Sequence, residues 1–346
     1  VSLNTKEYLA RKEFNYTAYY DALISNYFNQ LEGVKFPQML TLPFKHAQEL
    51  RYGENPHQKA AFYKETGKVE GTLAGAVQLH GKELSFNNIN DANGAIKILK
   101  EFEEPTVVAV KHTNPCGVGS GKSISKAYDK AYECDKESIF GGVLAINREV
   151  DKEVAERINS IFIEIVMAPS FSKEAIEILT KKKNIRLLTI ESIFDNDYTE
   201  YDLKKVLGGL LIQDRDTLLL SDELKVVTQK SPTEEEMKDL IFAWKTAKNM
   251  NSNGVVIAKD NATIGIGLGE VNRFWAVEEA IERSKDKIKG SVIASDGFFP
   301  FSDSIEVLGK AGVTAIIQPG GSIKDQEVLD AANRLGIAMV FTGVRH

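Results

Sequence analysis

The sequence has few cysteines, no surplus of positive charge and no long apolar run. Two cysteines, Cys116 and Cys134, exclude a disulfide framework and are too few for a cysteine-rich zinc site. A formal net charge of −6 argues against a general nucleic-acid binder, which usually carries a basic face. No stretch approaches the roughly 20 apolar residues of a membrane helix, and no signal peptide is visible. We therefore expect a cytoplasmic protein that binds neither nucleic acid nor membrane.

The remaining composition is that of ordinary globular material. The chain has 346 residues, of which 43% are hydrophobic and 27% are charged. This length is long for one domain and comfortable for two. Because the chain begins with Val1 rather than Met, we expect a fragment or a processed product.

The order of apolar and polar residues indicates a helix followed by alternating strands and helices. Near the start, apolar residues recur at three- and four-residue steps, and Gly33 follows as a stop signal; they are Tyr16, Tyr20, Leu23, Tyr27 and Leu31. Further along, the predicted strand 106–110 precedes the predicted helix 123–134, and this alternation continues to residue 341. The pattern predicts an α/β fold with a largely parallel sheet.

Two segments of the chain are weakly similar to each other. Residues 107–119 and 255–267 align without gaps and share five identities in thirteen positions. The similarity has two explanations: a duplicated α/β domain, or chance similarity between two buried strands. A duplication would make a cleft between the two domains a natural site.

The pair Lys111-His112 is the strongest candidate for catalysis. It ends an apolar strand, and we expect a Gly-rich turn and then a helix after it; open α/β sheets place ligands at the carboxyl ends of parallel strands. His is the usual general base near neutral pH, and an adjacent Lys⁺ disfavours its charged form. The same Lys can stabilise negative charge developing on a carbonyl oxygen. The alternative is a buried His with a satisfied hydrogen bond, and we favour catalysis over it.

A zinc deaminase is excluded by the residues that follow. That chemistry needs H-x-E and, later, P-C-x-x-C. Pro115-Cys116 lacks the second Cys, and no Glu stands two residues after His112. The zinc interpretation therefore fails on ligand count.

Two other motifs have competing explanations. In residues 51–58, Arg51 can grip a phosphate and Tyr52 can stack on a planar ring, but a tight structured turn explains the segment equally well. Residues 265–269 are Gly-rich, but Glu270 stands where the dinucleotide fingerprint needs its third glycine. A Gly-rich strand end or bulge therefore explains them better than a NAD site.

Polar and aromatic clusters adjoin several predicted strands of the second half. The amides of residues 251–253 and Arg273 can converge on a polar ligand. Three Phe in residues 295–303 form either part of a core or an aromatic wall with a carboxylate beside it. The turn 318–323 has N–H groups that can hold an anion or a ring carbonyl. Arg345, after the last strand, is a second candidate phosphate ligand.

Seven blocks in this order resemble the formyltransferase half of the bifunctional AICAR formyltransferase/IMP cyclohydrolase family, AICAR being 5-aminoimidazole-4-carboxamide ribonucleotide. The blocks cover essentially the whole chain: residues 51–58, 84–88 with Asp91, 111–119, 139–142, 251–255, 295–303 and 319–345. The resemblance implies two tandem cytidine-deaminase-like α/β/α domains without zinc, at 46–220 and 221–346, after a helical linker segment at 1–45. It also implies an obligate homodimer with its sites at the subunit interface.

The resemblance implies transfer of a formyl group from 10-formyltetrahydrofolate to the 5-amino group of AICAR. His112 would be the general base and Lys111 the charge stabiliser. The residues that would hold the nucleotide are Arg51, Tyr52, Asn253, Arg273 and Arg345. The residues that would contact the folate or line its site are Phe274, Phe298, Ser322 and Ile323, and Asp303 would lie close to the folate and the reacting centre.

The sequence also departs from the family. The cyclohydrolase half expected ahead of residue 1 is absent, and relatives usually continue a few residues beyond Arg345-His346. After Ala168-Pro169 the family often has a Gly that contacts the nucleotide, whereas this chain has Ser170. Family members often hold a potassium ion, whose ligands the sequence does not identify.

The rival hypothesis is a non-catalytic module that binds an anionic nucleotide, which would leave the Lys111-His112 pair unexplained.

Overall fold

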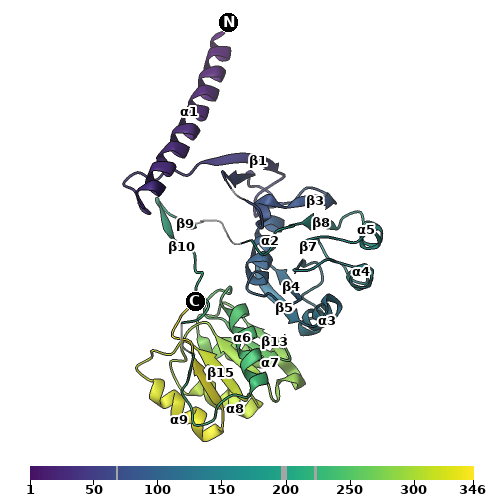
Figure 1. Ribbon diagram of the computed structural model, residues 1–346, viewed down its shortest axis with the longest axis vertical. Coiled ribbons are helices and arrows are strands. Elements are labelled where there is room, and N and C mark those ends of the chain that lie inside the picture. Colours follow the sequence, from purple (N-terminus) through teal and green to yellow (C-terminus); the bar gives the residue numbers. More distant parts are fainter. Residues whose placement is uncertain (68, 196–200, 222–223) are drawn as a thin grey trace. The chain divides into compact units, whose positions relative to one another are not determined.

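The computed structural model describes residues 1–67, 69–195, 201–221 and 224–346. The chain divides into two compact units, Val1–Val69 and Glu70–His346, and many of their elements are labelled in Figure 1. The domain boundaries expected at 45/46 and 220/221 stay predictions.

The first unit consists of a long helix and a hairpin. Helix α1 (Leu3–Leu31) starts at Ser2, whose hydroxyl accepts a hydrogen bond from the Thr5 N–H, and Gly33 follows it with a positive φ of 66°. Strands β1 (Phe44–Leu50) and β2 (Ala60–Glu65) pair antiparallel. The predicted helix and its stop signal are confirmed. None of the α1 residues, all of which the structure describes, is buried.

The second unit is built on a 12-stranded sheet covered by helices. The strand order is β11-β16-β15-β14-β12-β13-β5-β4-β6-β7-β8-β3. In the first half the elements are η1 (Leu73–Gly75), β3 (Val77–His80), α2 (Phe86–Leu99), β4 (Thr106–Lys111), β5 (Asn114–Ser120), α3 (Ile124–Cys134), β6 (Val143–Ile146), α4 (Lys152–Asn159), β7 (Ile165–Ala168), α5 (Lys173–Leu179) and β8 (Arg186–Thr189). The expected α/β fold, preceded by a helical segment, is confirmed.

The second half repeats these elements after a separate hairpin. The hairpin is β9 (Tyr201–Val206) and β10 (Gly209–Asp214). The repeated elements are β11 (Lys225–Val226), α6 (Glu234–Ala247), β12 (Val255–Lys259), β13 (Ala262–Gly267), α7 (Arg273–Ser284), η2 (Lys285–Ile288), β14 (Val292–Ser295), α8 (Asp303–Ala311), β15 (Ala315–Gln318), α9 (Asp325–Leu335) and β16 (Ala338–Phe341).

The sheet is mixed, so the expectation of a largely parallel sheet is wrong. Parallel pairing is present in β6-β7-β8 and β14-β15-β16. Between these blocks, the hairpins β4–β5 and β12–β13 place four antiparallel strands in the middle of the sheet. Strands buried on both faces are apolar throughout, and this composition does not reveal their direction.

The two halves are related by duplication rather than by chance similarity. Read from either end of the sheet, the strands follow the same order, with β3 and β8 matching β11 and β16. The two central hairpins turn at positions 148 residues apart, at His112-Thr113 and Asp260-Asn261, and all four residues have positive φ. Each hairpin also has a register shift at an equivalent place, after Ala109 and after Ile257.

The helices cover the two faces of the sheet differently. Val108 and Val110 pack into an apolar core with α2 residues, and the same core includes α6 residues of the other half. Val107 and Ala109 point to the opposite face, into the core that α3, α4 and α5 help to form. Helices α7, α8 and α9 cover that face in the second half (Figure 1). The halves meet where Ala262 of β13 pairs with Gly119 of β5.

Candidate active site

Lys111 and His112 lie at a tight β-hairpin turn. His112 and Thr113 have φ values of 53° and 64°, as the two central residues of a type I′ turn require. Lys111 is half-buried and its Nζ donates to the Phe140 carbonyl oxygen at 2.9 Å, whereas His112 is exposed. The turn therefore presents the imidazole to solvent beside a lysine that is held in place.

This local structure corrects two sequence-based expectations. The chain does not pass from His112 through a Gly-rich turn into a helix, because Gly117 and Gly119 lie within β5. The strand that ends in Lys111 is also antiparallel to both of its neighbours. Sequence reasoning looks for Gly or Asn where φ is positive, and here His and Thr occupy those positions.

Strand directions place the Lys111-His112 turn at the same sheet edge as the other predicted site segments of this unit. Strand β13 is antiparallel to β12 and to β5, and β12 is antiparallel to β14. Strands β13, β14, β15 and β16 therefore run in one direction, and β5 runs in the other. The start of β5 consequently lies at the edge where β13–β16 end. Three inter-strand steps separate β5 from β14, which is about 15 Å at the usual spacing.

Arg273 and Asn253 are joined at this edge by a buried network. Arg273 Nη1 donates to Ser295 Oγ at 2.6 Å and to Asp296 Oδ1 at 2.5 Å, and its Nη2 donates to Asn253 Oδ1 at 2.8 Å. The Arg273 and Asp296 side chains are 8% and 1% exposed. Gly297 lies so close that a Cβ there would be 2.6 Å from Arg273 Nη2. The network fixes the guanidinium, and Asp296 offsets its charge.

Sequence reasoning missed the specific role of Asp296. The sequence offers a carboxylate beside an aromatic wall as one of two alternatives, whereas the Asp296 carboxylate accepts from Arg273 and, at 2.5 Å, from Ser252 Oγ. Asn253 is also held at its other end, because its Nδ2 donates to the Glu270 carbonyl oxygen at 2.7 Å. Ser295 and Asp296 thus orient Arg273, and Arg273 together with the Glu270 carbonyl orients Asn253.

The aromatic segment after β14 serves both as core and as surface. Phe299 is fully buried, and its N–H donates to Gln318 Oε1 at 2.8 Å. Phe298 and Phe301 are 38% and 49% exposed, and Lys324 Nζ lies 4.4 Å from the centre of the Phe301 ring. The two alternatives for this segment, core and aromatic wall, therefore each describe part of it. Phe274, near the start of α7, is half-buried.

The loops after β14 and β15 bring the remaining predicted folate contacts to this edge. Ile323 is wholly exposed, and Ser322 Oγ accepts from the Lys324 N–H at 3.1 Å. Asp303 is exposed at the start of α8, where its Oδ1 accepts from the Ser304 N–H at 2.7 Å. The Gly321 N–H, expected to be open to an anion, instead donates to Asp325 Oδ2 at 2.7 Å.

Arg345 is exposed, but the next residue is firmly anchored. His346 Nδ1 lies 2.5 Å from Asp216 Oδ2, its Nε2 lies 3.3 Å from the Leu219 carbonyl oxygen, and its ring packs 5.0 Å from Trp244. The His346 side chain is 1% exposed. His346 therefore fixes the backbone that carries Arg345, a role that sequence reasoning missed because no motif or periodicity marks this residue.

Arg51 and Tyr52 belong to the other compact unit, Val1–Val69. They follow β1 in a turn that is closed by hydrogen bonds from the Gly53 N–H to the Gln58 carbonyl oxygen and from the Asn55 N–H to Gln58 Oε1, both 2.8 Å. The Arg51 guanidinium lies 5.7 Å from the centre of the Tyr52 ring. The segment is thus a tight structured turn, and Arg51 is exposed on it.

Ser170 lies away from this edge. It follows β7, which is parallel to β6, and β6 is antiparallel to β4. The end of β7 is therefore at the opposite sheet edge from Lys111. Ser170 Oγ donates to Glu149 Oε2 at 3.0 Å.

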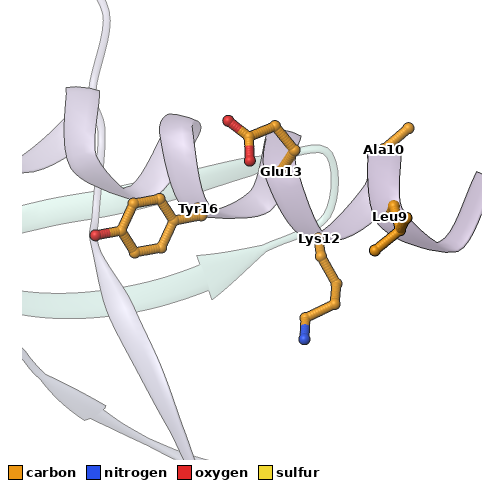
Figure 2. Close-up of a pocket in the computed structure, with 5 residues that line it drawn as sticks. All are labelled: Leu9, Ala10, Lys12, Glu13 and Tyr16. Atoms are coloured by element: carbon orange, nitrogen blue, oxygen red, sulfur yellow. The ribbon is translucent and has the colours of Figure 1, made fainter.

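Two hollows on the described surface lie away from the predicted site. Figure 2 shows the larger one, of about 560 Å³, whose lining residues all come from α1: Leu9, Ala10, Lys12, Glu13 and Tyr16. Side chains of a single helix cannot enclose a ligand, so this hollow is open surface. The smaller one, of about 250 Å³, lies where α3 meets the β12–β13 turn.

Neither cysteine has the properties of a nucleophile. Burial, followed by the neighbouring Cys134 thiol, raises the pKa of Cys116 to about 12, and burial raises the pKa of Cys134 to about 11. Such thiols stay protonated near neutral pH, whereas a cysteine nucleophile is a thiolate. Within the described ranges, no three His, Cys, Asp or Glu side chains form a metal-binding group.

Comparison with known proteins places the chain in a family. The family model described as the AICARFT/IMPCHase bienzyme matches residues 1–283. The bifunctional purine biosynthesis protein PurH of Acetivibrio thermocellus is 59% identical over 349 residues, covering 100% of this chain and 68% of the relative. The PurH proteins of Caldicellulosiruptor saccharolyticus and Bacillus subtilis are 56% and 54% identical, with the same coverage. The chain therefore belongs to the AICARFT/IMPCHase family, and the resemblance noted in its sequence is confirmed.

Proposed function

We propose that this chain transfers the formyl group of 10-formyltetrahydrofolate to the 5-amino group of AICAR in purine biosynthesis. The observation that carries this proposal is the Lys111-His112 turn, which shares a sheet edge with the Arg273–Asn253 network and the exposed Phe298. Nucleotide binding alone would not need a base beside a lysine. Residues 1–346 would provide formyl transfer, and ring closure to IMP would belong to the family's other half.

The chemistry matches the residue types at the turn. The amine of AICAR is conjugated with its ring and is a weak nucleophile, so it must lose a proton as the new C–N bond forms. His112 would accept this proton, while Lys111 would stabilise the oxyanion on the former formyl oxygen. The bond from the formyl carbon to N10 then breaks, and N10 takes up a proton to give tetrahydrofolate. A lysine ammonium has three N–H donors, and the hydrogen bond to Phe140 uses one.

The substrates would be held by residues outside the turn. Arg51, Tyr52 and Arg345 would bind the ribonucleotide, and a guanidinium suits a phosphate because it can donate two parallel hydrogen bonds. Asn253 and Arg273, which are hydrogen-bonded to each other while Arg273 is paired with Asp296, would face the base. The residues that would contact the folate or line its site are Phe274, Phe298, Asp303, Ser322 and Ile323.

A homodimer with its sites at the subunit interface completes the proposal. The apolar residues of α1 support it: Tyr16 and Leu31 are 70% and 64% exposed, and a helix with an exposed apolar stripe is usually covered by a partner. The separation of about 15 Å between β5 and β14 also fits a site assembled from two copies.

The co-substrate would be the reduced folate, with potassium as a further ion and no zinc. Cytoplasmic localisation stays part of the proposal; within the described ranges, no helix combines the length and apolarity needed to cross a bilayer.

A direct assay tests the proposal. The purified protein is incubated with AICAR and 10-formyltetrahydrofolate, and tetrahydrofolate and formyl-AICAR are quantified. We expect turnover without added zinc. A folded sample that binds AICAR but does not turn over would instead support the anionic nucleotide-binding module.

A further inference from the structure

Asp91 forms a hydrogen bond with the Lys111-His112 turn. It lies on α2, is half-buried, and its Oδ1 accepts a hydrogen bond from the Thr113 N–H at 2.8 Å. Helix α2 is itself well fixed, since Ser85 and Asn88 form a capping box and Asn88 Nδ2 donates to Glu164 Oε2 at 2.8 Å. The carboxylate therefore connects a rigid helix to the backbone beside His112.

This hydrogen bond holds one end of the peptide unit that follows His112. The N–H of that unit belongs to Thr113 and donates to Asp91, while its C=O belongs to His112. The carbonyl oxygen accepts from Thr113 Oγ1 at 2.6 Å and from Asn114 Nδ2 at 3.1 Å. Because the peptide is planar, holding both ends fixes ψ of His112 and φ of Thr113. Both residues have positive φ, which is costly without glycine and persists only where the surroundings hold it.

Packing adds to this constraint. Gly94, one turn after Asp91 on α2, is so close to the turn that a Cβ there would lie 3.1 Å from the Thr113 carbonyl oxygen. The helix backbone thus supports the turn directly, and a larger residue would push the turn outward by a few tenths of an ångström.

The second half of the chain also has an aspartate hydrogen-bonded to a hairpin turn, but this turn lacks the Lys-His pair. Asp239, 148 residues after Asp91, accepts from the Asp260 N–H at 2.8 Å and from the Asn261 N–H at 2.6 Å. That turn carries Lys259-Asp260 in place of Lys111-His112. Asp239 therefore holds the Asp260-Asn261 turn by hydrogen bonds, although that turn carries no histidine.

We propose that Asp91 is a positioning residue for formyl transfer, which fixes the His112–Thr113 peptide so that the imidazole points at the reacting amine. This inference rests on the proposed function. A displacement of about 1 Å can cost about 100-fold in rate. Asp91→Ala should lower kcat by about 10- to 100-fold while changing the KM for AICAR by less than about threefold, because the proposed phosphate ligands lie elsewhere. Asp91→Asn keeps an acceptor oxygen and should retain most of the activity.

Asp239→Ala is the matched control. It removes the equivalent carboxylate, so it should lower the midpoint of thermal unfolding at least as much as Asp91→Ala does, yet leave kcat within about twofold. Gly94→Ala is a second variant, which raises the helix propensity of α2; it should shift the turn and lower kcat with little loss of stability. Equal kcat losses for Asp91→Ala and Asp239→Ala would overturn the inference, as would an unchanged kcat in Asp91→Ala. If Asp91→Ala does not fold, an unchanged kcat in Gly94→Ala overturns the inference, and a lowered one supports it.

Amide hydrogen exchange separates this inference from the proposed function. Asp91→Ala should accelerate exchange of the Thr113 N–H, and Asp239→Ala should accelerate exchange at Asp260 and Asn261 but not at Thr113. If the unmodified chain shows no formyl transfer, the proposed function fails, and these exchange rates still decide whether Asp91 holds the turn. Unchanged Thr113 exchange in Asp91→Ala would show that it does not.

Discussion

Arg273 and Asp296 form an ion pair in the interior, with 2.5 Å between Nη1 and Oδ1. Both side chains are almost completely buried, at 8% and 1% exposure. Charges in such a place are tolerated because they are paired and hydrogen-bonded. The pair lies at the sheet edge that the Lys111-His112 turn shares, so it connects the stability of the second half to the geometry of the proposed site.

Removing the carboxylate of this pair should be strongly destabilising. Asp296→Ala leaves the Arg273 charge buried without a counter-charge, which typically costs about 3–5 kcal/mol of unfolding free energy. Denaturant unfolding measures this. The exposed pair Lys152–Glu156 gives the control, since Glu156→Ala should cost at most about 1 kcal/mol for the lost ion pair. A cost for Asp296→Ala as small as that of the control would show that Arg273 finds water or another partner.

Gly297 should not tolerate a side chain. The Cβ of Gly297→Ala would lie 2.6 Å from Arg273 Nη2, so the guanidinium must move away from Asn253. We expect AICAR affinity to fall by about tenfold, the equivalent of one lost polar contact. Gly209→Ala is the control, because its Cβ would meet Val206 Cγ2 at an ordinary 3.4 Å. The affinity of both variants for AICAR is measured by calorimetric titration. Equal affinities would show that the position of the Arg273 guanidinium does not affect AICAR binding.

Element positions were predictable from the sequence because they depend on local signals. The sequence predicts a helix over residues 123–134, and α3 (Ile124–Cys134) begins after Ser123, whose hydroxyl accepts a hydrogen bond from the Lys126 N–H. The duplication was also visible as Gly117-Val118-Gly119 and Gly265-Ile266-Gly267. Strand direction was not predictable, since the turn His112-Thr113 carries no glycine to mark a hairpin.

The placement of the candidate site segments was predictable from the sequence, but the contacts between their side chains were not. Residues 251–253, 295–303 and 318–323 were each expected near strand ends, and the register of β12–β15 brings them to one edge. The pairing of Arg273 with Asp296, and the use of the Gly321 N–H by Asp325, depend on side-chain directions in three dimensions. No sequence spacing encodes those directions.

The two buried thiols should make the protein less stable at high pH. In the folded state, burial raises the pKa values of Cys116 and Cys134 to about 12 and 11 from the ordinary thiol value of 9.0. The folded state therefore holds its thiol protons while the unfolded state loses them. The stability from this difference is fully present below pH 9 and is lost as pH rises toward the folded pKa values. Each thiol contributes a slope of about 1.4 kcal/mol per pH unit in that range.

A double variant isolates this contribution from other titrating groups. Between pH 8 and pH 10 the free energy of unfolding should fall for both proteins. For the double variant Cys116→Ala/Cys134→Ala, this fall should be smaller by about 3 kcal/mol than for the unmodified chain. Unfolding in urea under reducing conditions gives both values. Identical pH slopes for the two proteins would mean that the thiols are not buried as described.

Residues 1–346 should not close formyl-AICAR to IMP. The chain covers 68% of its PurH relatives, and the family resemblance places ring closure in the half that precedes this segment. Incubation of the purified chain with formyl-AICAR, followed by chromatography for IMP, tests the expectation. IMP above the level formed without protein would contradict it, and a full-length PurH relative serves as the positive control.

Substitutions of His112 and Arg345 should separate catalysis from binding. His112 is exposed at the β4–β5 turn, and Arg345 follows β16 on a backbone anchored by His346. His112→Ala removes a base that acts only in the transition state, so kcat and kcat/KM should fall together by on the order of 100-fold or more, with AICAR affinity nearly unchanged. Arg345→Ala removes a charge-assisted contact to phosphate, which acts in the ground and transition states alike. Its expected cost is about 1.5–3 kcal/mol, or one to two decades in Kd.

Steady-state rates and AICAR titration on the same preparations distinguish these roles. Because His112 is exposed, its replacement should leave the folded state intact, and a circular dichroism spectrum checks this. Arg345→Lys keeps the charge but loses the planar fork, so it should recover only part of the affinity. Loss of AICAR binding in His112→Ala, together with unaltered binding in Arg345→Ala, would reverse the assigned roles. A lowered kcat with an unchanged Kd in His112→Ala would support the imidazole as the base that takes the proton of the amine. A raised Kd in Arg345→Ala would support the guanidinium as the ligand of the phosphate.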